Sequence, residues 1–244
     1  MFSRRFTSMF AALALLVMMS VLTVASTADS TDNDAQKRSR VVAPINLAIL
    51  IQDDLVSQVD NEIKETKEFI RSLPQGSRVM VGYITAGTLQ VRQPFTTDLE
   101  KAASSLRILR SSTTASAFNP YVEVIEALDH FDNVSGRKAI LLISDGLDTS
   151  RGFDVTSAAN TLDLGRAIRE AKEREVVVYS FYAPSVGLSS RSRLAAGYGQ
   201  SSLNRLANET GGKAFFQGST GFVSFDSYFR RLRQELNDQF ARAY

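Results

Sequence analysis

Three short runs of apolar residues, each almost uninterrupted, dominate the sequence: residues 47–51, 139–143 and 176–179. Runs of this length without polar alternation are typical of strands that are covered on both faces. Helical patterns, with apolar residues three and four positions apart, lie between them over residues 55–73 and 164–171. This alternation predicts a three-layer, doubly wound, Rossmann-like α/β fold with a mostly parallel sheet.

One pair of strands departs from the parallel pattern. Residues 79–84 and 89–91 flank a turn at Ala86 and Gly87, which predicts a hairpin. The sheet should therefore have one antiparallel edge strand. Thr97 and Glu100 have the spacing of a capping box, which predicts a helix that carries apolar residues from 99 to 109.

The remaining elements follow from the same patterns. We expect a helix over 121–131, a long Ser- and Gly-rich loop over 184–200, a short helix near 203–207, a last strand over 214–216 and an amphipathic terminal helix over 225–240. The loop is a candidate for partner contact because long loops often carry function.

The N-terminus differs in composition from the rest of the chain. Arg4 and Arg5 precede a stretch that is apolar nearly throughout from residue 9 to 24, and small residues follow up to Ala28. This pattern is typical of a signal peptide over 1–28 with cleavage after Ala28, although an uncleaved membrane anchor has a similar length. We expect export to the periplasm or the medium, a polar linker over 29–40 and one domain over 41–244.

The charge balance argues against a nucleic-acid partner. Removing residues 1–28 takes Arg4 and Arg5 from the 28 basic side chains and no acidic one, which leaves 26 of each sign. A mature chain that is nearly neutral has no bulk attraction for nucleic acid.

The chain also contains no cysteine. This excludes a disulfide scaffold, a thiolate metal site and a lipoprotein attachment site.

The residue inventory does not favour an enzyme. His130 is the one histidine, and it falls near the end of a predicted helix. No serine lies in a Gly-x-Ser-x-Gly turn, and the glycines at 211 and 212 lack the spacing of a phosphate loop. We therefore expect a non-catalytic protein, with a metal-assisted hydrolase as the least favoured alternative.

Polar residues follow two of the buried strands. Residues 52–57 read Gln-Asp-Asp-Leu-Val-Ser, and residues 144–146 read Ser-Asp-Gly. Thr113 and Thr114 lie in a third polar loop. In open α/β sheets, ligands bind beyond the carboxyl ends of the strands, so these loops are the first candidates for a site.

From about Ile45 to the C-terminus, the chain resembles a von Willebrand factor type A domain of the bacterial exported branch. Four features in order carry the resemblance: the first apolar strand with its acidic loop, the strand that ends at Ser144-Asp145-Gly146, the strand over 176–179, and residues 206–212 leading to Phe215 and Phe216. The resemblance implies a type A fold and a protein-binding or adhesion function without catalysis.

Many members of this family hold a divalent cation such as Mg²⁺ with an Asp-x-Ser-x-Ser motif, a threonine and a later aspartate. Asp145 matches the later aspartate. In one alignment the motif falls on Gln52, Asp54 and Val56, and in the other, shifted by one residue, it falls on Asp53, Leu55 and Ser57. Valine and leucine cannot bind Mg²⁺, so either alignment breaks the motif.

Two interpretations of these residues remain open. Asp53, Asp54, Ser57 and Asp145 could form a modified cation site that supports cation-dependent adhesion. Alternatively, Asp53 and Asp54 only begin the first helix, where carboxylates stabilise the positive helix end. We expect no intact cation site and no other cofactor.

The terminal helix carries arginines at 230, 231, 233 and 242. These could contact an acidic partner or anionic lipid, but Glu235 and Asp238 share the helix, which favours a solvated face. We expect an unidentified protein partner, no nucleic acid, and membrane contact only if residues 1–28 are retained.

Overall fold

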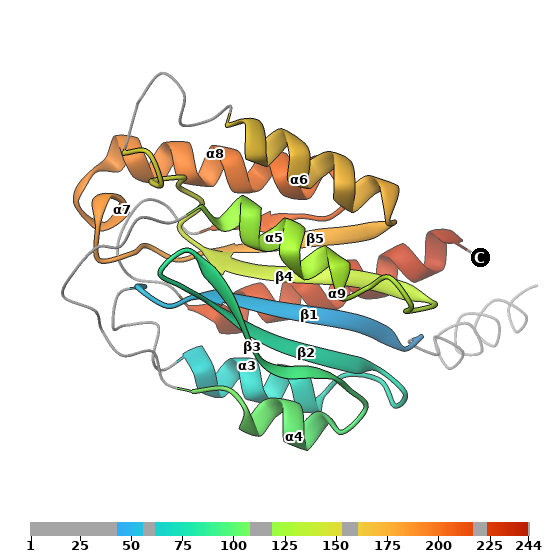
Figure 1. Ribbon diagram of the computed structural model, residues 1–244. Coiled ribbons are helices and arrows are strands. Elements are labelled where there is room, and N and C mark those ends of the chain that lie inside the picture. The colour runs from blue at the N-terminus through green and yellow to red at the C-terminus, as the bar shows by residue number, and fades with distance from the viewer. Residues whose placement is uncertain (1–42, 56–61, 108–118, 153–160, 217–223, 244) are drawn as a thin grey trace, which may run out of the picture. The chain divides into compact units, whose positions relative to one another are not determined.

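One six-stranded sheet organises the described part of the chain, with the strand order β3-β2-β1-β4-β5-β6 (Figure 1). The computed structural model describes residues 43–55, 62–107, 119–152, 161–216 and 224–243. The predicted signal peptide and linker lie outside these residues. Residues Val42–Tyr244 form one compact unit.

The strand directions confirm the sequence prediction. β1 (Ile45–Gln52) pairs in parallel with β2 (Arg78–Thr85) and with β4 (Arg137–Ser144). β5 (Val176–Tyr182) continues the parallel order to β6 (Ala214–Phe215). Only β3 (Thr88–Thr96), the second strand of the predicted hairpin, is antiparallel in the described sheet.

Helices cover both faces of the sheet, which explains why its central strands are apolar without alternation. On one face lie α3 (Glu62–Arg71), α4 (Leu99–Ser104) and α9 (Phe225–Ala243). On the other lie α5 (Pro120–Asp129), α6 (Leu162–Glu173) and α8 (Arg193–Glu209). In β1, Leu47 and Ile49 pack on the first face, whereas Ala48 and Leu50 pack on the second.

Aromatic residues attach the terminal helix to the sheet. The ring of Phe181 in β5 lies 5.4 Å from the ring of Phe225 and 4.9 Å from that of Phe229, measured between centroids. Tyr228 contacts the same ring at 5.1 Å. These contacts confirm that the terminal helix is amphipathic, with its apolar side against β5.

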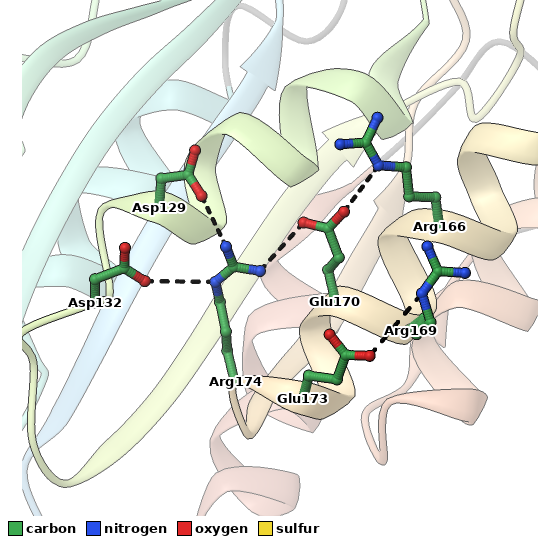
Figure 2. Close-up of polar contacts among 7 residues, drawn as sticks. All are labelled: Asp129, Asp132, Arg166, Arg169, Glu170, Glu173 and Arg174. Carbon is green, nitrogen blue, oxygen red and sulfur yellow. Dashed lines mark hydrogen bonds and ion pairs between the residues drawn. The ribbon is translucent and has the colours of Figure 1, made fainter.

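An arginine ties the ends of two helices together on the second face. Arg174, which follows α6, pairs with Asp129 at 2.8 Å, with Asp132 at 3.5 Å and with Glu170 at 3.1 Å (Figure 2). Arg166 also binds Glu170, at 2.8 Å. This network joins the C-terminal ends of α5 and α6 at the surface.

The predicted loop over 184–200 is wrong. It contains α7 (Leu188–Arg191) and the first half of α8, which begins at Arg193 after the N-cap Ser192. The glycines at 197 and 199 suggested a loop, but a Cβ at Gly199 would lie 1.9 Å from the Asp145 carbonyl oxygen. Gly199 therefore allows close packing of a helix and does not mark a flexible segment.

Two local predictions also need correction. The N-cap of α4 is Asp98, whose carboxylate accepts a hydrogen bond from the Lys101 N–H at 2.9 Å, and not Thr97. Glu100, the expected partner in the capping box, instead pairs with Arg71 at 2.7 Å. Leu55 does not belong to a helix: it pairs with Ser185 in an isolated bridge, and the described helix starts at Glu62.

Candidate functional site

The side chain of Gln52, at the end of β1, connects the ends of two neighbouring strands. Its Oε1 accepts hydrogen bonds from the Ser144 hydroxyl at 2.6 Å and from the Asp145 backbone N–H at 3.3 Å. Its Nε2 donates to Oδ1 of Asp54 at 2.7 Å. The Gln52 side chain is only 1% exposed. A buried amide needs protein partners, and here both its oxygen and its nitrogen have them.

Asp145 lies beside Gln52, and its carboxylate holds two loops. Oδ1 accepts a hydrogen bond from the Leu147 N–H at 3.0 Å, and Oδ2 accepts one from the Ser189 hydroxyl at 3.0 Å. The Ser189 oxygen in turn accepts from the Ser185 N–H at 2.7 Å. Burial raises the pKa of Asp145, although its hydrogen bonds favour the ionised form.

Asp54 is the second buried carboxyl group of this cluster. Burial raises its pKa to about 7; the hydrogen bond from Gln52 opposes the rise, and the charge of Asp145 adds to it. The Asp54 carbonyl also accepts a hydrogen bond from the Val186 N–H at 2.9 Å. Asp54 therefore connects the loop after β1 to the loop after β5.

Asp53 lies in a different environment. Its Oδ2 accepts hydrogen bonds from the Thr85 hydroxyl at 2.8 Å and from Nη2 of Arg107 at 3.0 Å. The Arg107 guanidinium also lies over the Tyr83 ring, 4.4 Å from its centroid. Of the predicted site residues, Asp54 and Asp145 thus belong to one network, whereas Asp53 pairs with the guanidinium group of Arg107. Ser57, Val56, Thr113 and Thr114 lie outside the described residues.

The chain was compared with families, curated proteins and solved structures. No family model and no curated protein matches it. An aerotolerance-related membrane protein from Bacteroides fragilis, solved with multiple mutations to serine, is 15% identical with a TM-score of 0.56, over 80% of this chain and 99% of that one. The protein BatB from Bacteroides thetaiotaomicron is 18% identical with a TM-score of 0.56, over 80% and 98%.

The human COPII-coat protein Sec24c gives a TM-score of 0.50 at 11% identity, over 80% of this chain and 32% of that one. These three proteins share one type of fold. The chain has a von Willebrand factor type A-like fold. The resemblance and the fold class predicted from the sequence are therefore confirmed. Because the sequence identities are below one fifth, the likeness concerns the fold alone.

In one of the two alignments with the family, Gln52 takes the place of the first aspartate of the cation motif. The amide Nε2 found there is a donor, and it is directed at a carboxylate oxygen of Asp54. Hard divalent cations need oxygen ligands, which a donor NH₂ group cannot supply. In the described ranges, no three acidic, histidine or cysteine side chains gather as a metal site would require. As arranged, these residues do not fit the family's cation site.

Sequence reasoning missed several members of this network. Arg107, Ser185 and Ser189 come from segments that carried no recognisable motif, and the serines were noted only as part of a Ser-rich loop. The Tyr182 hydroxyl is also buried here, beside Ser189. Burial and the neighbouring Asp145 raise the pKa of Tyr182, so it stays a neutral donor.

The part of the chain with described coordinates contains no helix that is both long enough and apolar enough to cross a membrane.

Proposed function

We propose that this chain is an exported, non-catalytic protein-binding module, and that the loops at the carboxyl edge of its sheet bind a protein partner without a bridging cation. The hydrogen bonds of Gln52 are the observation that carries the proposal. In the family, the cation connects the loop after the first strand to the later aspartate. Here an amide connects Asp54 to Ser144 and to the backbone of Asp145.

A cation-bridged partner would need an open coordination position. A buried amide that already bonds to three neighbouring groups supplies neither a positive charge nor an open position. Affinity must then come from direct contacts, mainly from apolar and charged side chains at the edge. The fold likeness to the COPII-coat protein Sec24c is consistent with a binding role.

Export rests on the sequence of residues 1–28 and agrees with the fold neighbours. One neighbour is described as an aerotolerance-related membrane protein from a bacterium.

Non-catalytic function is consistent with the position of His130, which is exposed at the C-cap of α5. The other end of α5 contacts the loop after β4. There the Tyr121 hydroxyl donates to the Gly146 carbonyl at 2.5 Å.

Calorimetric titration with Mg²⁺ and Mn²⁺ tests cation independence. We expect no saturable heat from the native chain or from Asp145→Ala. Saturable heat in the native chain that disappears in Asp145→Ala would instead support cation-dependent adhesion through Asp53, Asp54, Ser57 and Asp145. Hydrolytic turnover that disappears in the same variant would support the metal-assisted hydrolase.

Partner binding is tested by cross-linking capture from the exported fraction of the native host, with and without a chelator. We expect the same partner to be captured in both conditions. If capture from native material fails in both, the proposal of a binding module is wrong. If the chelator abolishes capture, the cation-independent part is wrong.

A further inference from the structure

The start of α8 has a charge pattern that folding does not explain. Arg191 and Arg193 flank the N-cap Ser192, and both are exposed. A helix N-terminus carries partial positive charge, which favours acidic side chains and disfavours arginine. From residue 176 to 208 the sequence contains no aspartate or glutamate. Neither arginine has an ion-pair partner among the residues with described positions.

Large apolar side chains are exposed at the same edge. Leu194, the next residue in α8, is 54% exposed, and Leu162, the first residue of α6, is 90% exposed. α6 and α8 lie side by side on one face of the sheet, and both begin at the carboxyl edge (Figure 1). Arginine is enriched in protein–protein interfaces, and Leu194 adds apolar surface directly beside Arg193.

Buried contacts hold this surface in place. The Ser189 hydroxyl in α7 donates to the Asp145 carboxylate, and the backbone of Gly199 in α8 packs directly against the Asp145 carbonyl. The surface therefore has its shape before a partner arrives, which lowers the entropy lost on binding.

We propose that Arg191, Arg193 and Leu194, here called the α8 corner, dock an acidic linear segment of a protein partner that also carries a leucine-like side chain. This inference rests on the proposed binding function. Guanidinium groups bind carboxylates in paired hydrogen bonds, and Leu194 offers apolar surface directly beside them. An anionic membrane is a poorer match, because membrane recognition by charge uses clusters of four or more basic residues.

Fluorescence anisotropy with a labelled twelve-residue peptide of Asp, Glu and Leu tests the proposal. The same peptide with Asn and Gln in place of Asp and Glu measures the role of charge. We expect the double variant Arg191→Glu/Arg193→Glu to bind the acidic peptide at least about tenfold more weakly than the native chain. The matched control is Arg92→Glu/Arg231→Glu, which makes the same charge change at exposed positions on β3 and α9. It should bind like the native chain.

Three results would overturn the inference: no saturable binding of the acidic peptide, equal binding of the neutral peptide, or equal losses in the two double variants. Binding to vesicles of phosphatidylglycerol in place of the peptide, lost in Arg191→Glu/Arg193→Glu, would also overturn it, since the occupant would be lipid. A captured partner that still binds this variant refutes the α8 corner but leaves the binding module intact. Absence of any captured partner refutes the binding module itself.

Discussion

The Nε2 of Gln52 donates a hydrogen bond of 2.7 Å to the carboxylate of Asp54, two residues further along the chain. The same amide accepts from Ser144 and from the Asp145 N–H, so one side chain joins the ends of β1 and β4. Gln52 therefore connects the loop after β1 to the loop after β4 through hydrogen bonds between protein groups.

Replacing Gln52 by alanine should therefore destabilise the fold. Gln52→Ala removes three hydrogen bonds and leaves the buried Asp54 and Ser144 side chains short of partners. We expect a loss of about 2–4 kcal/mol in the free energy of unfolding, measured in urea. The control Gln90→Ala removes an exposed glutamine from β3 and should change stability by less than about 0.5 kcal/mol. Equal effects of the two substitutions would contradict a linking role for Gln52.

Placing a complete Asp-x-Ser-x-Ser motif at positions 52, 54 and 56 should create a response to cations. The triple variant Gln52→Asp/Asp54→Ser/Val56→Ser carries Asp-x-Ser-x-Ser beside Asp145. We expect Mn²⁺ to raise its thermal unfolding temperature; at a hundredfold excess over the dissociation constant the gain would be about 2.7 kcal/mol. The native chain should show no such gain. If the triple variant folds but its unfolding temperature does not respond to Mn²⁺, these three positions are not sufficient to form a cation site.

The strands of the sheet were predictable because the composition of each strand depends on its own burial. Strands buried on both faces must be apolar throughout, so residues 47–51 and 139–143 were recognisable without knowledge of their neighbours. The position of Asp145 followed in the same way, since parallel strands end at one edge of a sheet.

The network around Asp145 was not predictable from such patterns. The pairing of Asp53 with Arg107 joins residues 54 positions apart, and the contact of Asp145 with Ser189 joins residues 44 apart. No periodicity encodes either contact. The second half of α8 agrees with the helix predicted near 203–207. Its first half was not predictable, because serines and glycines lower helix propensity over 184–200, whereas tertiary packing against Asp145 favours the helix.

Stability should fall as pH rises towards neutrality because of Asp54. Its pKa is about 7 in the folded chain, above the ordinary value of 3.8. Between these values the folded state binds more protons than the unfolded state, so the free energy of unfolding decreases through this window and levels off above pH 7. Asp54→Asn keeps an acceptor for Gln52 but cannot ionise. We expect it to gain on the order of 3 kcal/mol over the native chain between pH 4 and 8.

The measurement is urea unfolding of both chains at several pH values. Asp226→Asn, at an exposed position on α9, is the control and should follow the native pH dependence. If Asp54→Asn also follows it, Asp54 does not titrate in this window.

Charge reversal at the start of α8 should stabilise the helix. Arg193→Glu places a negative charge at the positive helix end and removes an arginine that has no acidic partner in its own segment. We expect the free energy of unfolding to rise by about 0.3–1 kcal/mol at low ionic strength and the gain to shrink in salt. Thermal unfolding at two salt concentrations measures it. A loss of stability would mean that Arg193 supports the fold and is not kept for binding.

Two glycines of α8 should respond in opposite directions to the same substitution. A Cβ at Gly199 would lie 1.9 Å from the Asp145 carbonyl oxygen, whereas a Cβ at Gly197 meets nothing within 4 Å. Gly199→Ala must therefore push the helix away from the end of β4, and we expect a loss of about 3 kcal/mol or more. Gly197→Ala should instead gain about 0.5–1 kcal/mol, because alanine favours a helix interior. Urea unfolding of both variants decides the matter: equal changes would mean that α8 does not pack on Asp145 as closely as the backbone contact requires.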